Sequence, residues 1–437
     1  MSATVRTNRN ASFGSIHGLG VACALAAGVW LGAAEAPTKL VNSGLSPYAI
    51  SLCMVAGVFT ARWTVPTLLK GTRSVFADLN QNRHLILNAI VAGMLWAVAN
   101  TLTVFAIRDV GLTIAFPLWN TNSLVGILWG RLLFGELKGA SRGNIVKVVL
   151  GALAIVAAAV MLGFATIHGE GHGGGPHSGR AVNGILAAAG ASLLWGTMYV
   201  PYRKAYISGM NPLSFVTVFT IGELGTVLAL VLALDGGTKA AIFHSTETRH
   251  LLFWLFLGGF AWVIGDLFQQ FATKYLGIGR AIPLSNTNQL WGLAWGALVF
   301  GELAHADWPH RLLVVAGSLV MILGALAVST AVATEREHAS TDQALQRECL
   351  RYNLDYDRVV RASNGLETDN DSGKNGRRGW LDYVIVAAAT GVFVYLGWNA
   401  TVPPLGMNFA WMGVLAAVLV GSAGVAGWGL WKATRFS

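Results

Sequence analysis

Apolar stretches of roughly 20 residues alternate with short polar segments along most of this chain. A helix of that length crosses the hydrocarbon core of a bilayer. The pattern therefore predicts twelve membrane-spanning segments. Their approximate bounds are 17–36, 47–69, 85–107, 110–134, 145–167, 182–202, 212–234, 250–273, 277–300, 311–333, 381–401 and 409–431.

Part of the pattern is repeated. The stretch 105–137 reads FAIRDVGLTIAFPLWNTNSLVGILWGRLLFGEL, and the stretch 271–303 reads FATKYLGIGRAIPLSNTNQLWGLAWGALVFGEL, with 18 of 33 aligned positions identical. The first five predicted spans thus match the next five, and an odd number of spans turns the second copy upside down. We predict an all-α integral membrane protein with a ten-helix, five-plus-five inverted-repeat transporter core.

The rest of the chain is organised around these two repeats. The predicted parts are a cytoplasmic tail (1–16), the first repeat (17–167), a Gly/His-rich linker (168–181), the second repeat (182–333), a polar cytoplasmic loop (334–379) and a C-terminal transmembrane hairpin (380–437). Apolar residues recur at helical spacing within the polar loop, which predicts a short amphipathic helix on the inner membrane surface. They are Leu345, Cys349, Tyr352, Tyr356 and Val359.

Composition and charge agree with a membrane protein. Charged residues make up 12% of the chain and hydrophobic residues 54%, whereas a soluble domain is about a quarter charged. With the N-terminus placed in the cytoplasm, 22 lysines and arginines fall inside and 6 outside, or 14 against 6 without the polar loop. This positive-inside pattern predicts a multi-pass protein of the cell membrane, as in a bacterial plasma membrane. It also explains the net charge of +9 without nucleic acid.

The repeated segment carries a polar motif that follows a proline. Pro117 and Pro283 each precede an Asn-Thr-Asn sequence about ten residues into a span. A proline there permits a kink, and carboxamides offer donors and acceptors together, as a neutral polyol requires. The competing interpretation is hydrogen bonding between helices. The candidate substrate-binding residues are Asn120, Asn122, Asn286, Asn288 and Gln289.

Tryptophans also recur in both repeats. Trp96 and Trp262 align at the offset of 166 residues, and Trp119 directly precedes Asn120. The apolar face of a sugar ring stacks on indole, so these three are candidate substrate-binding residues. The alternative is that they are ordinary membrane-interface tryptophans.

Carboxyl groups inside spans are candidates for proton coupling, because a charge in the bilayer is costly and generally functional. They are Asp266, Glu223 and Glu35. Asn100 aligns with Asp266 and joins the candidate substrate site. A structural ion pair with a lysine or arginine is the alternative for Asp266.

Two further features suggest structural roles. Gly135-Glu136 and Gly301-Glu302 close matching spans, where capping or pairing with Lys138 is expected. The histidines of the linker lie among glycines, so we predict a linker rather than a metal site, and no cofactor.

These motifs resemble those of a known family. Gly93-Met94-Leu95-Trp96-Ala97-Val98-Ala99-Asn100, Val110-Gly111-Leu112 and Phe134-Gly135-Glu136 resemble the third and fourth spans of glucose/ribose porters in the drug/metabolite transporter superfamily. The second half repeats the pattern with Trp262, Gly265, Leu276-Gly277 and Phe300-Gly301-Glu302. The resemblance covers 17–333 and implies a ten-helix fold and ion-driven uptake of a small sugar. It extends to rhamnose–proton symporters and, more distantly, to ureide permeases, whereas 334–437 departs from the ten-span pattern.

The sequence therefore favours a secondary transporter of a small neutral solute, a monosaccharide, by proton symport and alternating access. Its expected partners are this substrate, protons, membrane lipid and a second copy of the chain in a homodimer. Alternative cargoes are ureides, nucleosides or amino acids. One alternative class is a membrane-embedded transferase, which would need clustered carboxylates or histidines that this sequence does not offer. Another is a sensor that signals through the segment 334–379. A carrier would keep some transport after deletion of 334–437, whereas a sensor would lose its function.

Overall fold

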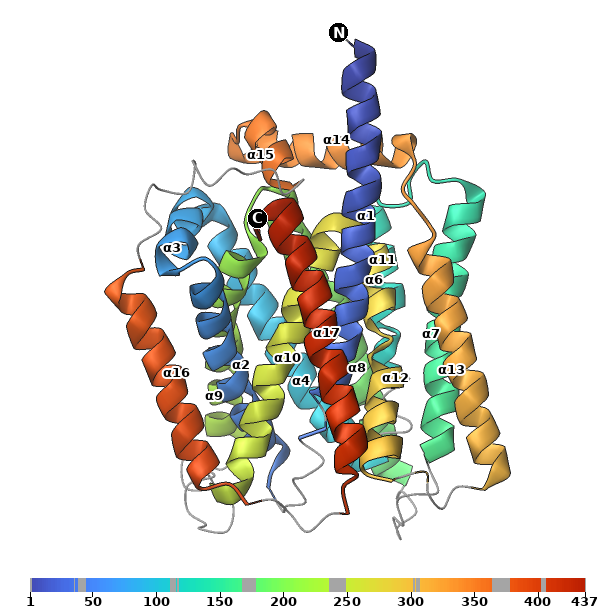
Figure 1. Ribbon diagram of the computed structural model, residues 1–437, viewed down its shortest axis with the longest axis vertical. Helices are drawn as coiled ribbons and strands as arrows, with labels where there is room; N and C mark the ends of the chain where they lie inside the picture. The colour runs from blue at the N-terminus through green and yellow to red at the C-terminus, as the bar shows by residue number, and fades with distance from the viewer. Residues whose placement is uncertain are drawn as a thin grey trace.

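The computed structural model describes residues 2–34, 36–37, 45–110, 115, 118–166, 178–235, 249–301, 303, 307–363, 378–401 and 406–436. Within these ranges the chain forms helices and no strands (Figure 1). Ten of these helices are long and apolar enough to cross a membrane. The fold is thus that of an all-α integral membrane protein, as the hydrophobic pattern predicts.

The ten long helices correspond to ten of the twelve predicted spans. They are α1 (Ser2–Ala33), α2 (Pro47–Leu69), α4 (Ile86–Val110), α7 (Arg142–Thr166), α8 (Ser178–Ile207), α9 (Pro212–Leu234), α10 (Arg249–Leu276), α13 (Trp308–Ser329), α16 (Trp380–Trp398) and α17 (Phe409–Thr434).

The other two predicted spans are interrupted helices. The ninth consists of α11 (Ile278–Ser285), α12 (Asn288–Ala294) and a π-helical turn, η5 (Trp295–Val299). In the fourth, a turn at Thr121 separates helical residues 118–120 from α6 (Asn122–Leu133). The predicted spans 110–134 and 277–300 thus each contain a break, at Thr121 and at residues 286–287, beside the motif where a kink is expected.

Local hydrogen bonds accompany both interruptions. The hydroxyl of Thr287 donates to the carbonyl of Leu284 at 2.8 Å, and the hydroxyl of Thr121 donates to the carbonyl of Leu118 at 2.6 Å. Such bonds compete with the helical ladder. Pro283, inside α11, also lacks a backbone donor.

Two predicted segments outside the membrane contain more helix than the sequence indicated. Within the tail 1–16, residues 2–16 are helical, because α1 begins at Ser2 and projects beyond the bundle (Figure 1). The described part of the polar loop contains two helices, α14 (Glu335–Tyr352) and α15 (Tyr356–Ser363), rather than one. Asn353 ends α14 in a left-handed conformation, φ 51°, and the Asp355 carboxylate accepts the amide of Asp357 as α15 begins.

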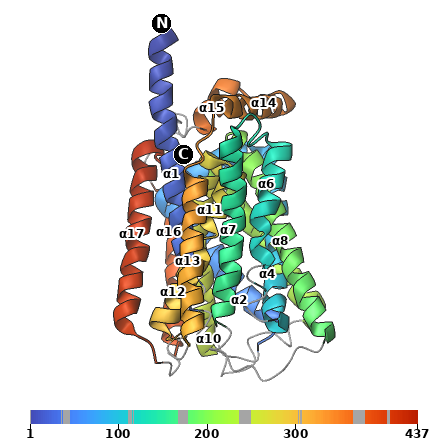
Figure 2. The same ribbon diagram turned by 90° about the vertical axis from the view of Figure 1, so that its right-hand side faces the viewer.

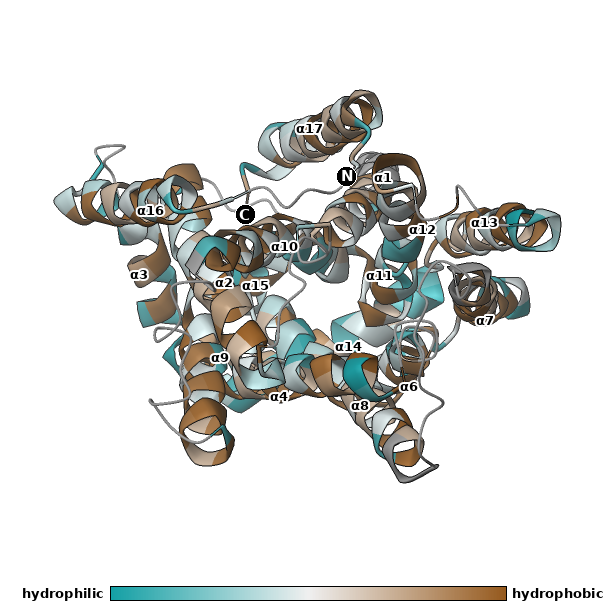
Figure 3. Ribbon diagram, turned by 90° about the horizontal axis from the view of Figure 1, so that it is seen from below, coloured by the Kyte–Doolittle hydropathy of each residue, from teal (hydrophilic) through white to brown (hydrophobic). Residues whose placement is uncertain are grey.

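One end of the bundle carries most of the structure outside the spans. Here α1 projects, α14 and α15 lie, and α3 (Thr72–Gln81) and η2 (Arg83–Leu85) connect α2 to α4 (Figures 1 and 2). We call this end the N-terminal face. Viewed along the bundle, α16 and α17 lie at the periphery (Figure 3). Large apolar side chains on α7, α13 and α17 are exposed, as expected of lipid contact, for example Leu150, Leu323 and Val420.

Glycines allow four central helices to approach closely. An added Cβ on Gly57 of α2 would lie 2.0 Å from the carbonyl oxygen of Phe256, and one on Gly259 of α10 would lie 2.0 Å from that of Met54. In the same way, an added Cβ on Gly93 of α4 would lie 2.0 Å from the carbonyl oxygen of Phe219, and one on Gly222 of α9 would lie 2.0 Å from that of Ile90. The two crossings, α2 with α10 and α4 with α9, are thus built alike from small residues.

The repeat relates these glycines in pairs. Gly222 follows Gly57 by 165 residues, and Gly259 follows Gly93 by 166. Each crossing joins a helix of one repeat to a helix of the other. The contact between the repeats is therefore fixed by equivalent positions on both sides.

Replacing Gly222 by valine should destabilise the protein, because the new side chain would overlap the backbone of α4. Overpacking of this kind costs roughly 1–3 kcal/mol, which would lower the unfolding temperature of the purified protein in a thermal scan. Gly225, one turn further along α9, has no described atom within 4 Å of an added Cβ. Gly225→Val is thus the matched control, and equal shifts for the two variants would contradict the packing argument.

Candidate functional site

The two helix interruptions meet at the centre of the structure. The side-chain amide of Asn286 donates to the backbone oxygen of Asn120 at 3.3 Å, to Oδ1 of Asn122 at 2.9 Å and to Oγ of Ser123 at 3.0 Å. Asn120 and Asn286 are repeat-related and both buried. The Asn-Thr-Asn motifs of the two repeats are therefore in direct contact.

Several polar atoms beside this contact have no hydrogen-bond partner among the described residues. They are Nδ2 of Asn120, Oδ1 of Asn288 and Nε2 of Gln289. A buried polar group without a partner costs about 1–3 kcal/mol. Two buried donors and one buried acceptor are thus left without a protein partner among the described residues.

Small residues bring neighbouring helices against the interrupted segments. An added Cβ on Gly28 of α1 would lie 2.5 Å from the hydroxyl of Thr287, and one on Gly32 would lie 2.3 Å from the carbonyl of Asn288. On the other side, Gly196 of α8 lies against Val125 and the backbone oxygen of Asn122. Helices α1 and α8 therefore enclose the motif of the opposite repeat.

The predicted tryptophans divide into two groups. Trp96 and Trp262 contact each other, with ring centroids 4.9 Å apart and an interplanar angle of 60°. Trp96 is buried, and its Nε1 has no hydrogen-bond partner in the described part of the chain. Trp119 packs instead edge-on against Trp195, at 6.0 Å and 83°, beside buried alanines.

A buried charge cluster lies next to the Trp96–Trp262 pair. Arg62 of α2 binds Asp266 of α10 at 2.7 Å and Glu223 of α9 at 3.5 Å, and all three side chains are 0% exposed. The guanidinium carbon lies 4.0 Å from the ring centre of Phe219 and 5.4 Å from that of Trp262. The structural ion pair considered for Asp266 is therefore present, with Arg62 as its partner.

The two carboxylates of this cluster are held unequally. Asp266 also accepts a hydrogen bond from Nε2 of Gln270 at 3.1 Å. Glu223 has only the longer contact to Arg62, and its Oε1 has no partner among the described residues. If both were ionised, the cluster would carry one net negative charge away from water, which costs several kcal/mol.

Side chains connect the charge cluster to the helix interruptions. Gln269 donates to the hydroxyl of Ser285 at 2.5 Å and accepts from the hydroxyl of Tyr199 at 3.0 Å. Ser285 immediately precedes Asn286, and Gln269 immediately precedes Gln270, which binds Asp266. The two sites are thus joined by a continuous series of hydrogen bonds and adjacent residues on α10 and α11.

The remaining candidates lie elsewhere. Asn100 donates to the hydroxyl of Ser51 at 3.0 Å, joining α4 to α2. Glu35, Pro117 and Glu302 lie outside the described residues, as do the linker histidines His168, His172 and His177.

Sequence reasoning missed three contributors. Arg62 lies within the second span, where a buried arginine is itself a functional signal. Tyr199 and Ser123 carry no such signal, because hydroxyls are common in membrane helices. Their roles follow only from the contacts between helices.

Glu136 has the expected capping role, but its ion-pair partner is Arg203 rather than Lys138. Its carboxylate accepts the amides of Ile278 at 3.0 Å and Gly279 at 2.8 Å, and binds Arg203 at 3.2 Å. It therefore caps the first turn of α11 from the opposite repeat. This contact lies at the N-terminal face of the bundle.

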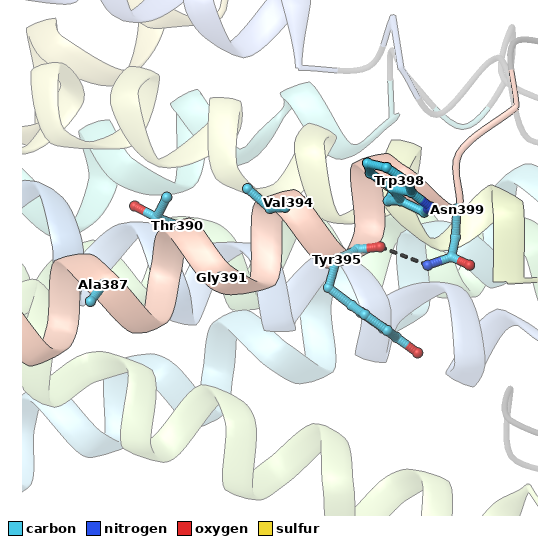
Figure 4. A pocket seen from close by; sticks show the side chains of 7 residues that line it. All are labelled: Ala387, Thr390, Gly391, Val394, Tyr395, Trp398 and Asn399. Carbon is cyan, nitrogen blue, oxygen red and sulfur yellow. Dashed lines mark hydrogen bonds between the residues drawn. The ribbon is translucent and has the colours of Figure 1, made fainter.

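A separate apolar groove lies on the peripheral helix α16. It has a volume of about 750 Å³ and is lined by residues from Ala387 to Asn399, including Tyr395 and Trp398 (Figure 4). Both aromatic side chains are largely exposed. The groove is thus apolar and exposed, unlike the buried polar site, and it lies on a surface where lipid contact is expected.

Comparison with known proteins fits this arrangement. The family described as "Sugar transport protein" matches residues 45–165 and 186–354, more than half of the chain. The chain belongs to this sugar transport family. The match includes both interrupted helices and all three residues of the charge cluster.

Individual relatives of the sugar transport family are similar over shorter ranges. A protein named "putative sugar uptake protein" in Listeria innocua is 24% identical over 56% of this chain and 78% of its own length. Similarly named proteins of Lactobacillus johnsonii and Streptococcus pyogenes are 30% identical over 28% of this chain and 43% identical over 17%. The chain spans about a quarter of the length of the Streptococcus relatives it matches. The matched family and these relatives are both named for the transport or uptake of sugars.

Proposed function

We propose that this protein carries a monosaccharide across the cell membrane by alternating access between two inverted repeats, 17–167 and 182–333. The observation that carries this proposal is the contact of the two interrupted helices through Asn286 and Asn120, beside unpartnered polar atoms. Interrupted helices at the interface between repeats are the usual location of substrate sites in secondary transporters. The family and the names of its relatives supply the substrate class.

The chemistry of the open positions favours a neutral polyol. The amides of Asn120 and Gln289 can donate and the side-chain oxygen of Asn288 can accept, and each hydroxyl of a sugar does both. The indole Nε1 of Trp96 adds a donor, and the Trp96–Trp262 pair offers an apolar surface for a ring face. Arg62, the nearby cation, is already bound by two carboxylates, which disfavours an anionic substrate.

The charge cluster is the proposed site of proton coupling. One arginine between two carboxylates is neutral when one carboxyl is protonated, and Glu223 holds the weaker contact. We assign the transported proton to Glu223 and a permanent ion pair to Arg62 and Asp266. The path through Gln270, Gln269 and Ser285 couples protonation to the substrate position.

Orientation follows from the distribution of lysine and arginine. The bias supports a cytoplasmic location for the N-terminal face, with α14 and α15. The contact of Glu136 with the start of α11 supports a conformation that is closed towards the cytoplasm.

Uptake of labelled monosaccharides into proteoliposomes, with and without an inward proton gradient, tests this function. We expect one sugar to accumulate above its external concentration only when the gradient is present. Accumulation of a ureide, nucleoside or amino acid instead would replace the substrate assignment. Protein-free liposomes and liposomes with an unrelated membrane protein are the controls for leakage.

A further inference from the structure

Helix α14 lies across the N-terminal face, roughly perpendicular to the spans (Figures 1 and 2). One stripe of this helix is directed at the bundle. Glu337, Ala344 and Glu348 follow one another at intervals of seven and four residues, which places them on one helical face. Glu337 and Ala344 are buried, and both glutamates bind residues of the bundle.

Glu337 connects the two repeats. Its carboxylate forms a bidentate pair with Arg280 of α11, at 2.7 and 2.9 Å, and accepts the backbone amide of Leu137 at 3.1 Å. Leu137 belongs to the first repeat and Arg280 to the second. Burial disfavours the ionised carboxyl, but Arg280 and the Leu137 amide more than offset this, so the pKa of Glu337 lies below its ordinary value.

A second cross-repeat ion pair lies nearby. Glu136 of the first repeat binds Arg203 of the second and caps α11, the helix that carries Arg280. The two pairs together are electrically neutral and each is largely buried. Breaking one buried partner of such a pair is strongly destabilising.

The turn beneath α14 is shaped to receive it. Gly135 and Gly139 have φ angles of 69° and 79°, and an added Cβ would lie 2.5 Å from Oγ of Ser340 and 2.9 Å from Cβ of Arg336. Gly301, the repeat counterpart of Gly135, has the same φ of 69° but no described atom within 4 Å of an added Cβ. The same glycine conformation thus occurs at equivalent positions of both repeats, and among the described residues only Gly135 is covered by another helix.

The far end of α14 is attached to α8. Lys204 donates to the hydroxyl of Tyr352 at 2.8 Å and lies 3.9 Å from the carboxylate of Glu348. Tyr352 also packs on His84, with ring centroids 4.3 Å apart. Helix α14 therefore contacts both repeats along its length.

We infer that α14 is a latch that holds the N-terminal face of the carrier closed, with Glu337 as the residue that joins the repeats. This inference rests on the proposed alternating access, since only a carrier must open this face. Separation of the repeats has to remove Glu337 either from Leu137 or from Arg280. The latch thus sets how often this face opens without contributing to the substrate site.

Accessibility of α14's inner stripe tests the latch without any sugar. A cysteine replaces Ala344 in a background in which Cys23, Cys53 and Cys349 are replaced by alanine, and a polar maleimide labels the purified protein. Ala344 is 3% exposed, so labelling should be slow. Glu337→Gln should accelerate it about tenfold, whereas Glu335→Gln, an exposed neighbour on the same helix, should leave it unchanged.

The pairing partner gives a second, independent readout. Arg280→Gln should accelerate labelling to a similar extent, and the double variant should show little more than either single one. Equal labelling rates for the Glu337→Gln protein and the protein with Glu337, each eluting as one species, would overturn the inference.

If Glu337→Gln does not fold, a second experiment replaces it. A bismaleimide then joins Lys138→Cys to Gln343→Cys, since both residues line one surface pocket. That tether should keep Ala344→Cys slow to label even with Arg280→Gln, and rapid labelling would equally overturn the latch. Absence of sugar uptake by the unaltered protein, by contrast, would refute the proposed function without testing the contacts of α14.

Discussion

Asn120→Ala should lower sugar uptake about fivefold to tenfold while leaving thermal stability unchanged or slightly raised. The side-chain amide of Asn120 has no hydrogen-bond partner among the described residues, so its removal deletes no known structural bond. A hydrogen bond to a substrate hydroxyl contributes about 1–1.5 kcal/mol, and 1.4 kcal/mol is a factor of ten in affinity. Initial uptake rates and unfolding temperatures of the same preparation measure both effects.

Asn286→Ala provides the contrast. Its amide holds Asn122 and Ser123 together with the backbone of Asn120, so uptake and stability should fall together. Two variants of one repeated motif thus separate substrate contact from helix–helix bonding. Normal uptake by a stable Asn120→Ala protein would contradict the assigned contact.

Glu223→Gln should abolish gradient-driven accumulation while sparing exchange of sugar between the two sides. Glutamine keeps the shape and hydrogen-bonding capacity of the protonated glutamate but cannot release a proton. Arg62 remains paired with Asp266 at 2.7 Å, so the variant should fold. The ratio of internal to external sugar is then expected to fall to about one, because no proton gradient is coupled to transport. Undiminished accumulation would exclude Glu223 as the proton carrier.

Asp266→Asn should behave differently, because it removes the strong partner of Arg62. Loss of one member of a buried ion pair costs about 3–5 kcal/mol. We therefore expect a marked fall in unfolding temperature or in the yield of monodisperse protein, together with loss of transport. A stable Asp266→Asn protein that accumulates sugar would show that Glu223 holds Arg62 in its place.

The repeat made part of the candidate site predictable. Because they lie at equivalent positions of two related segments, Asn120, Asn286, Trp96 and Trp262 were assigned from sequence to one candidate site. The structure brings the two asparagines into contact with each other, and likewise the two tryptophans. The prolines indicated a kink in each span but not the turns at Thr121 and at residues 286–287, since apolar periodicity reports burial and not local backbone conformation.

The charge cluster shows where sequence reasoning reached its limit. Arg62, Glu223 and Asp266 were all visible as ionisable residues in or near spans. Their association depends on how α2, α9 and α10 cross, which glycines such as Gly57 and Gly222 determine. The cluster also has no counterpart at the repeat-related positions, where Val58, Val227 and Asn100 stand, so the repeat could not reveal it.

The segment after the second repeat illustrates a third situation. Helical spacing of Leu345, Cys349 and Val359 correctly indicated an amphipathic helix, but these residues form a small cluster between α14 and α15. The polar stripe through Glu337 makes the contacts with the bundle. Periodicity of apolar residues therefore identified the helix and not the face that binds the transporter core.

A cryo-electron microscopy map of the protein with its transported monosaccharide would test the central claim most directly. The account predicts sugar density between the two helix interruptions, with hydroxyls about 3 Å from Nδ2 of Asn120 and Oδ1 of Asn288. Sugar density confined to another location, such as the groove on α16, with only water at the interruptions, would contradict it.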